Sequence, residues 1–259
     1  MSGVDPAPAA VIFDVDGTLV DSERFGHRVA FNGAFAALGL PYHWDEDVYG
    51  RLLMVAGSER RLDHFLAAEG VDAGARRWLV PAVYEEKTSR LLAMIGNGAI
   101  PPRRGVPELL EELAAARVRL GVATAGTRSW VLTLLDRVFP AVTFHAVVTT
   151  SDVAANKPDP ACYQRALEQL AVPASAALAV EDSSPGLAAA TAAGLRTVVV
   201  TNGYTSGHDL SGAAVVLDGF GPEAAVRSDP HGLRPSPPVN LAVLRSVLAG
   251  APFPCGSRV

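Results

Sequence analysis

The chain has 259 residues, of which 49% are hydrophobic and 19% charged, a composition typical of a soluble globular protein with one large domain or a core plus a smaller one. The formal net charge of −5 argues against a general nucleic-acid-binding role and gives no global attraction for anionic ligands. No apolar run is long enough to cross a bilayer, and the first residues lack the basic and apolar regions of a secretory leader. We therefore expect a cytoplasmic protein with no nucleic-acid and no membrane partner.

Taken in chain order, short apolar runs predict strands separated in most cases by helical stretches. The predicted strands lie near residues 9–15, 119–124, 144–149, 177–181, 195–201 and 213–217. The predicted helices cover residues 107–116, 129–138, 160–170 and 185–193. Alternation of strand and helix predicts the α/β class, with a Rossmann-like parallel sheet covered by helices on both faces.

The segment between the first two strands departs from this alternation. Residues 23–100 contain no clear strand, but they show helical periodicity, as in Leu62, Phe65 and Leu66. A segment of this length is too long for a loop, so we expect an inserted helical domain at 23–100 and a core made of 1–22 and 101–259.

The C-terminal part carries less information. Residues 228–238 are rich in proline, glycine and polar residues and predict a surface linker, and residues 240–249 predict a final helix with Asn240 as its cap.

The first strand ends in a pair of carboxylates, Asp14 and Asp16, followed by Gly17. Two carboxylates this close raise each other's pKa unless a cation compensates, and oxygen ligands favour a hard cation, Mg²⁺ first. One carboxylate then remains available as a nucleophile. A calcium loop and a purely structural acidic turn are the alternatives, but an EF-hand loop needs a glycine at its sixth position and a glutamate at its twelfth.

Two other strand ends carry polar residues of a matching kind. Thr124 and the small residues Ala125 and Gly126 can bind phosphate oxygens through a hydroxyl and backbone N–H groups, although a helix cap at Thr127 would explain them as well. Lys157 precedes Pro-Asp-Pro, which restricts its backbone, and the alternative is an exposed lysine in a turn.

A third strand ends in Glu181 and Asp182, with Ser184 expected as the cap and Pro185 as the first residue of a helix. The two carboxylates can compensate the helix dipole, but two acidic residues at the end of a buried strand are costly unless a cation lies near them. Lysine is also rare: the chain has 22 lysines and arginines together, and Lys87 and Lys157 are its two lysines. We expect them where arginine cannot serve.

Parallel strands have their carboxyl ends at the same edge of the sheet, so we expect the polar residues that follow them to lie together. Open parallel sheets bind their ligands at this edge. The order and spacing of Asp14, Asp16, Thr124, Lys157 and Asp182 resemble the four motifs of the haloacid dehalogenase-like hydrolase superfamily, over nearly the whole chain to about residue 220.

Within that superfamily the chain resembles the β-phosphoglucomutase/CbbY-like subgroup, and looks closest to the CbbY sugar-bisphosphate phosphatases. The stretches that carry this resemblance are 44–53, 57–61, 86–88 and 181–183. Two positions depart from the subgroup pattern, because Glu59 stands where a lysine is usual and Ala125-Gly126 where a second hydroxyl or amide is often found.

The resemblance implies a Mg²⁺-dependent phosphatase that acts through an aspartyl-phosphate. Asp14 would be the nucleophile and Asp16 the acid/base, while Thr124 and Lys157 would bind the phosphoryl oxygens. The metal would be held by Asp14, Asp182 and the backbone carbonyl of Asp16, and Glu181 would support these ligands.

The helical insert would cap the site and contact a small phosphorylated sugar, for example xylulose 1,5-bisphosphate, in a monomeric enzyme. Thr124 and Ala125 would bind the first phosphate. Arg61 and Lys87 would bind a second phosphate, and Glu23 would bind a hydroxyl. The alternatives are a phosphosugar mutase, a dehalogenase, and a non-catalytic phosphate- or metal-binding module. A dehalogenase needs neither Mg²⁺ nor the second carboxylate, so Asp16 and Asp182 argue against it.

Overall fold

The computed structural model describes residues 7–55 and 57–250, which divide into two compact units. The core unit contains the described residues up to Val20, then Pro102–Val131, and those from Phe139 onward. The helical unit contains the described residues of Asp21–Pro101 together with Leu132–Val138. The last turns of α6 (Arg128–Val138) therefore belong with the helical unit, a grouping that the sequence did not predict.

The core unit is built on one sheet, which has seven strands within the described residues, in the order β3-β2-β1-β4-β5-β6-β7. Every neighbouring pair is parallel except β6 and β7, which are antiparallel. The sheet therefore confirms the predicted Rossmann-like class. The strands are β1 (Ala10–Phe13), β2 (Arg119–Ala123), β3 (Ala146–Val148), β4 (Ala177–Glu181), β5 (Arg196–Val200), β6 (Val215–Leu217) and β7 (Val226–Ser228).

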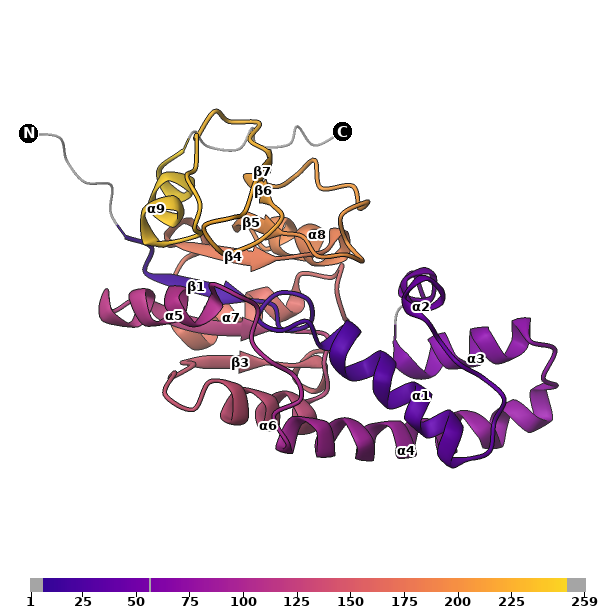
Figure 1. Cartoon of the computed structure of the whole chain (residues 1–259). Coiled ribbons are helices and arrows are strands. Elements are labelled where there is room, and N and C mark those ends of the chain that lie inside the picture. The colour runs from indigo at the N-terminus through magenta and orange to yellow at the C-terminus, as the bar shows by residue number, and fades with distance from the viewer. Residues whose placement is uncertain (1–6, 56, 251–259) are drawn as a thin grey trace, which may run out of the picture. The chain divides into compact units, whose positions relative to one another are not determined.

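Helices cover both faces of this sheet (Figure 1). Helices α5 (Val106–Ala115) and α9 (Leu241–Ala249) contact each other on one face, and α7 (Ala161–Leu170) contacts α8 (Ser184–Ala192) on the other. Short 3₁₀ turns follow β3 at Thr150–Asp152 and precede β4 at Ala174–Ala176. The strands β1 and β4 are buried along their full length because helices shield them from both sides.

The helical unit contains a π-helical turn η1 (Glu23–His27) and helices α1 (Arg28–Ala37), α2 (Glu46–Leu52), α3 (Ser58–Ala68) and α4 (Ala73–Gly96). Its core is aromatic, with the ring of Trp44 4.6 Å from Phe31 and 5.0 Å from Phe35. The side-chain amide of Asn32 bonds both backbone groups of Trp44, which fixes the chain between α1 and α2 against this core. The helical insert expected from the periodicity is thus confirmed.

Several boundaries differ from the sequence prediction. The strands predicted at 144–149 and 213–217 shorten to Ala146–Val148 and Val215–Leu217, although His145 N and Ala214 N still donate to backbone oxygens of the neighbouring strands. The cap of α8 is Ser183, whose hydroxyl accepts from Gly186 N, and the prediction of Ser184 was wrong by one residue. The strand β7 was not predicted, and its last residue, Ser228, had been assigned to the linker. The predicted helix cap at Asn240 is confirmed.

Among the described residues, no helix combines the length and the apolar character that spanning a membrane requires. Cys162 is buried and free, while Cys255 lies outside the described residues.

Candidate active site

The motif residues lie beyond the carboxyl ends of the central strands. The ladder between β1 and β4 ends at the bond from Asp14 N to Val180 O (3.0 Å), and the chain then turns at Gly17, where φ is +83°. Glycine suits this turn because a side chain is strained at positive φ. Because β1 has β2 on one side and β4 on the other, residues after these three strands meet at one place.

Lys157 joins the carboxylates at this edge. Its Nζ donates to Asp14 Oδ1 and to Glu181 Oε1, both at 2.6 Å, and its side chain is 7% exposed. Tyr163 also donates to Glu181 Oε1, at 2.7 Å, and the Lys157 ammonium lies 5.1 Å from the Tyr163 ring centroid. The prediction that Lys157 belongs to the site rather than to an exposed turn therefore agrees with its burial.

The pKa values of Asp14, Asp182 and Lys157 in this cluster are all raised. Burial, together with Glu181 and Asp16, raises the pKa of Asp14 to about 8, although Lys157 opposes the shift. Burial and the charges of Glu181 and Asp14 likewise raise the pKa of Asp182 well above its usual value. For Lys157, burial lowers the pKa, but the attraction of Asp14 and Glu181 outweighs burial, so the net shift is upward. The cations nearby, Lys157 beside Asp14 and Arg103 near Asp182, thus compensate the buried carboxylates only in part.

Among the described residues, Asp14, Glu181 and Asp182 form a group of buried carboxylates whose oxygens lie within 4.8 Å of one another. This donor set and its excess negative charge fit a hard divalent cation. The two Glu181 oxygens already accept bonds, however: Oε1 from Lys157 and Tyr163, and Oε2 from Asp182 N and from the N–H and hydroxyl of Ser183. Glu181 is therefore better suited to orient the site than to replace water on a metal.

Thr124 and Ala125 follow β2 at the same edge. Thr124 is buried, its N–H donates to Val148 O at 3.0 Å, and its hydroxyl accepts from Gly126 N at 3.0 Å. Ala125 is exposed. The arrangement presents a small turn after a central strand, which is suited to an anion.

The other predicted substrate residues, Glu23, Arg61 and Lys87, lie in the helical unit, where the first two are connected through Tyr49. Arg61 is buried on α3, with Nε donating to Leu52 O at 3.1 Å and Nη1 to the Tyr49 hydroxyl at 3.3 Å. The Tyr49 hydroxyl donates to Glu23 Oε2 at 2.5 Å. Lys87 is 3% exposed on α4, with its ammonium 5.3 Å from the Phe31 ring centroid. The structure therefore brings Glu23 and Arg61 together through Tyr49.

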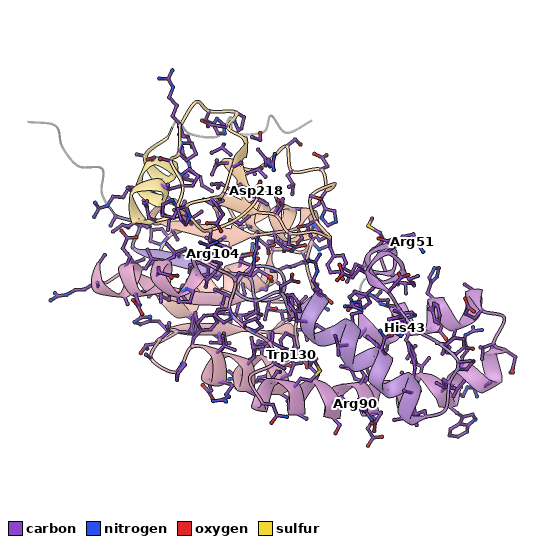
Figure 2. The ribbon with its side chains drawn as sticks, in the orientation of Figure 1. His43, Arg51, Arg90, Arg104, Trp130 and Asp218 are labelled. Carbon is purple, nitrogen blue, oxygen red and sulfur yellow. The ribbon has the colours of Figure 1, made fainter. Side chains whose placement is uncertain are left out.

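The other arginines of this unit differ in exposure. Arg51 on α2 (labelled in Figure 2) and Arg60 are exposed, in contrast to Arg61.

Sequence reasoning missed three residues of the core site. Tyr163 lies in the apolar stripe of α7, where an aromatic residue suggests packing alone. Asn202 follows β5 at the ligand-binding edge, a position that would have identified it, and its Nδ2 donates to Asp182 Oδ2 at 2.7 Å. Arg103 gives no signal in the sequence, because it follows no strand and belongs to no motif.

Comparison with known proteins shows the family. The haloacid dehalogenase-like hydrolase family matches residues 11–200. Protein CbbY of Rhodobacter capsulatus is 41% identical over 207 residues, which cover 79% of this chain and 90% of that protein. The validoxylamine A 7′-phosphate phosphatase of Streptomyces hygroscopicus subsp. limoneus is 32% identical and covers 78% of this chain and 88% of its own length.

A solved structure is similar over the same extent. Mutant CbbY from Rhodobacter sphaeroides, in complex with xylulose-(1,5)bisphosphate, superposes with a TM-score of 0.74 at 37% identity, covering 82% of this chain and 95% of that one.

Proposed function

We infer, from the premise that this chain belongs to the haloacid dehalogenase-like hydrolases, that it is a Mg²⁺-dependent phosphatase of small phosphorylated sugars. The observation that carries this proposal is the buried cluster in which Lys157 bonds Asp14 and Glu181 beside Asp182. A carboxylate paired with an ammonium group and open to a divalent cation is the arrangement that phosphoryl transfer through a covalent intermediate requires.

In the proposed reaction, Asp14 attacks phosphorus, and the sugar oxygen leaves as the aspartyl-phosphate forms. Asp16, two residues further along the turn, gives its proton to that oxygen and afterwards accepts one from the water that hydrolyses the intermediate. Lys157 holds Asp14 in position and, with Thr124, binds the phosphoryl oxygens. Tyr163 and Lys157 keep Glu181 fixed from the other side.

We propose that Asp14, Asp182 and the backbone carbonyl of Asp16 hold the metal, with Glu181 as support. The Asp16 carboxylate is not part of the buried group formed by the described residues Asp14, Glu181 and Asp182, which agrees with its separate role as acid/base. When bound, Mg²⁺ supplies positive charge that offsets the crowded carboxylates and the phosphoryl oxygens.

For the substrate, we propose a sugar bisphosphate whose second phosphate is bound by Arg61 and Lys87, and a hydroxyl bound by Glu23. A solved relative, mutant CbbY, is in complex with xylulose-(1,5)bisphosphate, which supports this choice. Both cations are buried beside aromatic rings, with Arg61 5.5 Å from Tyr49 and Lys87 5.7 Å from Tyr84, so their charges are largely shielded from water. Charges in such surroundings attract an anion strongly.

The test is phosphate release by the purified chain with Mg²⁺ from a panel of phosphorylated sugars that includes xylulose 1,5-bisphosphate. We expect a bisphosphate to exceed its matching monophosphate in kcat/KM, and chelation of Mg²⁺ to stop turnover. Asp14→Asn should lose several orders of magnitude, as expected for a covalent nucleophile, and Asp16→Asn roughly 10²–10⁴-fold. Isomerised sugar phosphate instead of free phosphate would identify a mutase, and no turnover of any compound would identify a binding module.

Two further predictions from the sequence, a monomeric state and a cytoplasmic location, accompany this proposal. Size-exclusion chromatography with light scattering tests the first of them, with an expected mass of 27.0 kDa.

A further inference from the structure

The side chain of Arg103 connects two segments beside the candidate metal site. Its Nη1 donates to Gly17 O at 2.5 Å and to Val200 O at 2.9 Å, and its Nη2 donates to Thr201 O at 2.7 Å. The guanidinium carbon also lies 5.1 Å from the ring centroid of Phe220. One planar cation thus bonds the turn after β1 to the carboxyl end of β5, a geometry for which lysine has no equivalent.

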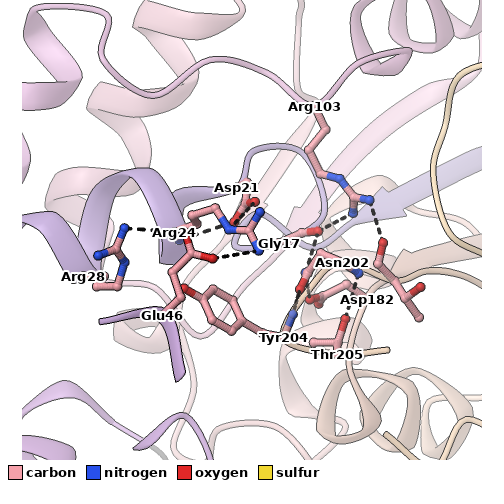
Figure 3. A network of polar contacts seen from close by, with 11 residues as sticks. Gly17, Asp21, Arg24, Arg28, Glu46, Arg103, Asp182, Asn202, Tyr204 and Thr205 are labelled. Atoms are coloured by element: carbon pink, nitrogen blue, oxygen red, sulfur yellow. Dashed lines mark hydrogen bonds and ion pairs between the residues drawn. The ribbon is translucent and has the colours of Figure 1, made fainter. Parts of the chain in front are cut away.

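Asn202 makes a second connection to the same turn. Its Nδ2 donates to Gly17 O at 3.3 Å and to Asp182 Oδ2 at 2.7 Å, as Figure 3 shows. Its Oδ1 accepts from Tyr204 N at 2.8 Å, and its own N–H donates to Thr205 Oγ1 at 3.1 Å. The hydrogen bonds with Tyr204 and Thr205 therefore fix Asn202 in place, while its side-chain amide connects Gly17 to Asp182.

Gly17 is packed directly against these groups. A Cβ atom at this position would lie 2.3 Å from Asp182 Oδ2 and 2.6 Å from Asn202 Nδ2, far inside the distance that real side chains tolerate. The backbone that follows Asp16 therefore lies directly against Asp182, with Asn202 beside both.

These bonds matter because the sheet no longer holds the chain at this point. The register between β1 and β4 ends at Phe13 and Val180, and the last ladder bond is the one from Asp14 N to Val180 O. Asp16 and Asp182 lie beyond it on separate segments. Backbone bonds such as that from Gly17 N to Val20 O shape the turn itself. Side-chain bonds to Gly17 O, the acceptor that Arg103 and Asn202 share, connect the turn to β5 and to Asp182.

We propose that Arg103 and Asn202 are positioning residues for the metal site, which set the distance between the turn at Asp16 and the carboxylate of Asp182. The proposal rests on the proposed function, because it assumes that Asp14, Asp182 and the Asp16 carbonyl hold Mg²⁺. Neither Arg103 nor Asn202 is assigned a contact with the substrate. Residues that orient metal ligands in this way typically contribute about 10–100-fold to metal affinity.

The direct test is isothermal titration calorimetry of Mg²⁺ into the substrate-free full chain. We expect Arg103→Lys and Asn202→Ala each to weaken Mg²⁺ binding by about 10–100-fold. Arg103→Lys keeps the charge, but a single ammonium nitrogen does not reproduce the planar fork that reaches the three carbonyls from two nitrogens. The matched control is Arg104→Lys, because the neighbouring Arg104 side chain is 77% exposed and pairs with Glu223 on the surface. This variant should bind Mg²⁺ like the wild type.

A second measurement separates positioning from general stability. In phosphate-release assays of variants shown to be folded, excess Mg²⁺ should restore most of the kcat of Arg103→Lys and Asn202→Ala, whereas a distorted catalytic geometry would persist at saturating Mg²⁺. Wild-type Mg²⁺ affinity in both variants, whatever their thermal stability, would overturn the positioning role and leave the proposed function intact. A wild-type chain that binds no Mg²⁺ would instead overturn the proposed function and the positioning role with it.

Discussion

Replacement of Gly186 by alanine is a sharp test of the active-site geometry. Gly186 lies in the first turn of α8, and an added Cβ would meet Cδ, Oε1 and Oε2 of Glu181 at 2.0 Å. Ordinary van der Waals contact begins at 3.4 Å, so the carboxylate would have to move by 3.4 − 2.0 = 1.4 Å. That carboxylate is held by hydrogen bonds from both sides, including those of Lys157 and Tyr163.

The size of the effect follows from these bonds. Each hydrogen bond to a charged group is worth roughly 1.5–3 kcal/mol, and a shift of this size breaks at least two of them. Alanine in place of glycine inside a helix returns about 1 kcal/mol. We therefore expect Gly186→Ala to lower the free energy of unfolding by roughly 2–5 kcal/mol, where alanine in a helix normally raises it. Because Lys157 loses one of its two carboxylate partners, we also expect kcat to fall by about 100-fold, the loss typical of a 1 Å misplacement.

The assay is thermal and urea unfolding of the purified variant, together with phosphate release. Gly96→Ala is the matched control, since Gly96 ends α4 with open space around its Cβ position, and this variant should be as stable as the wild type or slightly more so. A Gly186→Ala variant with wild-type stability and turnover would refute the packing of Glu181 against α8.

The remaining predictions concern single side chains. Lys157→Arg should be nearly as inactive as Lys157→Ala in phosphate release, because a guanidinium is too large for a buried position with two carboxylate oxygens at 2.6 Å; wild-type turnover would show that only the charge matters. Tyr163→Phe removes the hydroxyl that donates to Glu181 and should lower the free energy of unfolding by roughly 1.5–3 kcal/mol, measured by urea denaturation. Burial lowers the pKa of His208, whose Nδ1 accepts from Ser184 N, so the folded state binds fewer protons than the unfolded one. The contribution of His208 to stability should therefore fall as the pH drops below about 6.5, the ordinary histidine pKa, so in urea titrations the wild type should lose stability on acidification relative to a His208→Gln variant.

The sequence by itself determined the class of the fold and the edge of the sheet at which the candidate site lies. Strand and helix patterns are local, with periods of two and 3.6 residues, and they located the buried strands β1 and β4 and the helical insert. The rule that ligands bind beyond the carboxyl ends of parallel strands then placed Asp14, Thr124 and Asp182 at one edge. The sequence pattern did not predict the short strand β7, because its three residues are all exposed and show no apolar alternation.

The partners of the site residues were decided only by the tertiary structure. Lys157 and Asp14 are 143 positions apart, and Gly17 and Asn202 are 185 apart, so no local pattern connects them. These contacts depend on the strand order, in which β4 lies beside β1 and β5 beside β4. Tyr163 and Arg103 belong to no strand end, and their hydrogen bonds to Glu181 and Gly17 arise only when helices and loops pack on the finished sheet. The sequence shows which chemical groups the polar side chains carry, but the packing of distant segments decides which partners those groups contact.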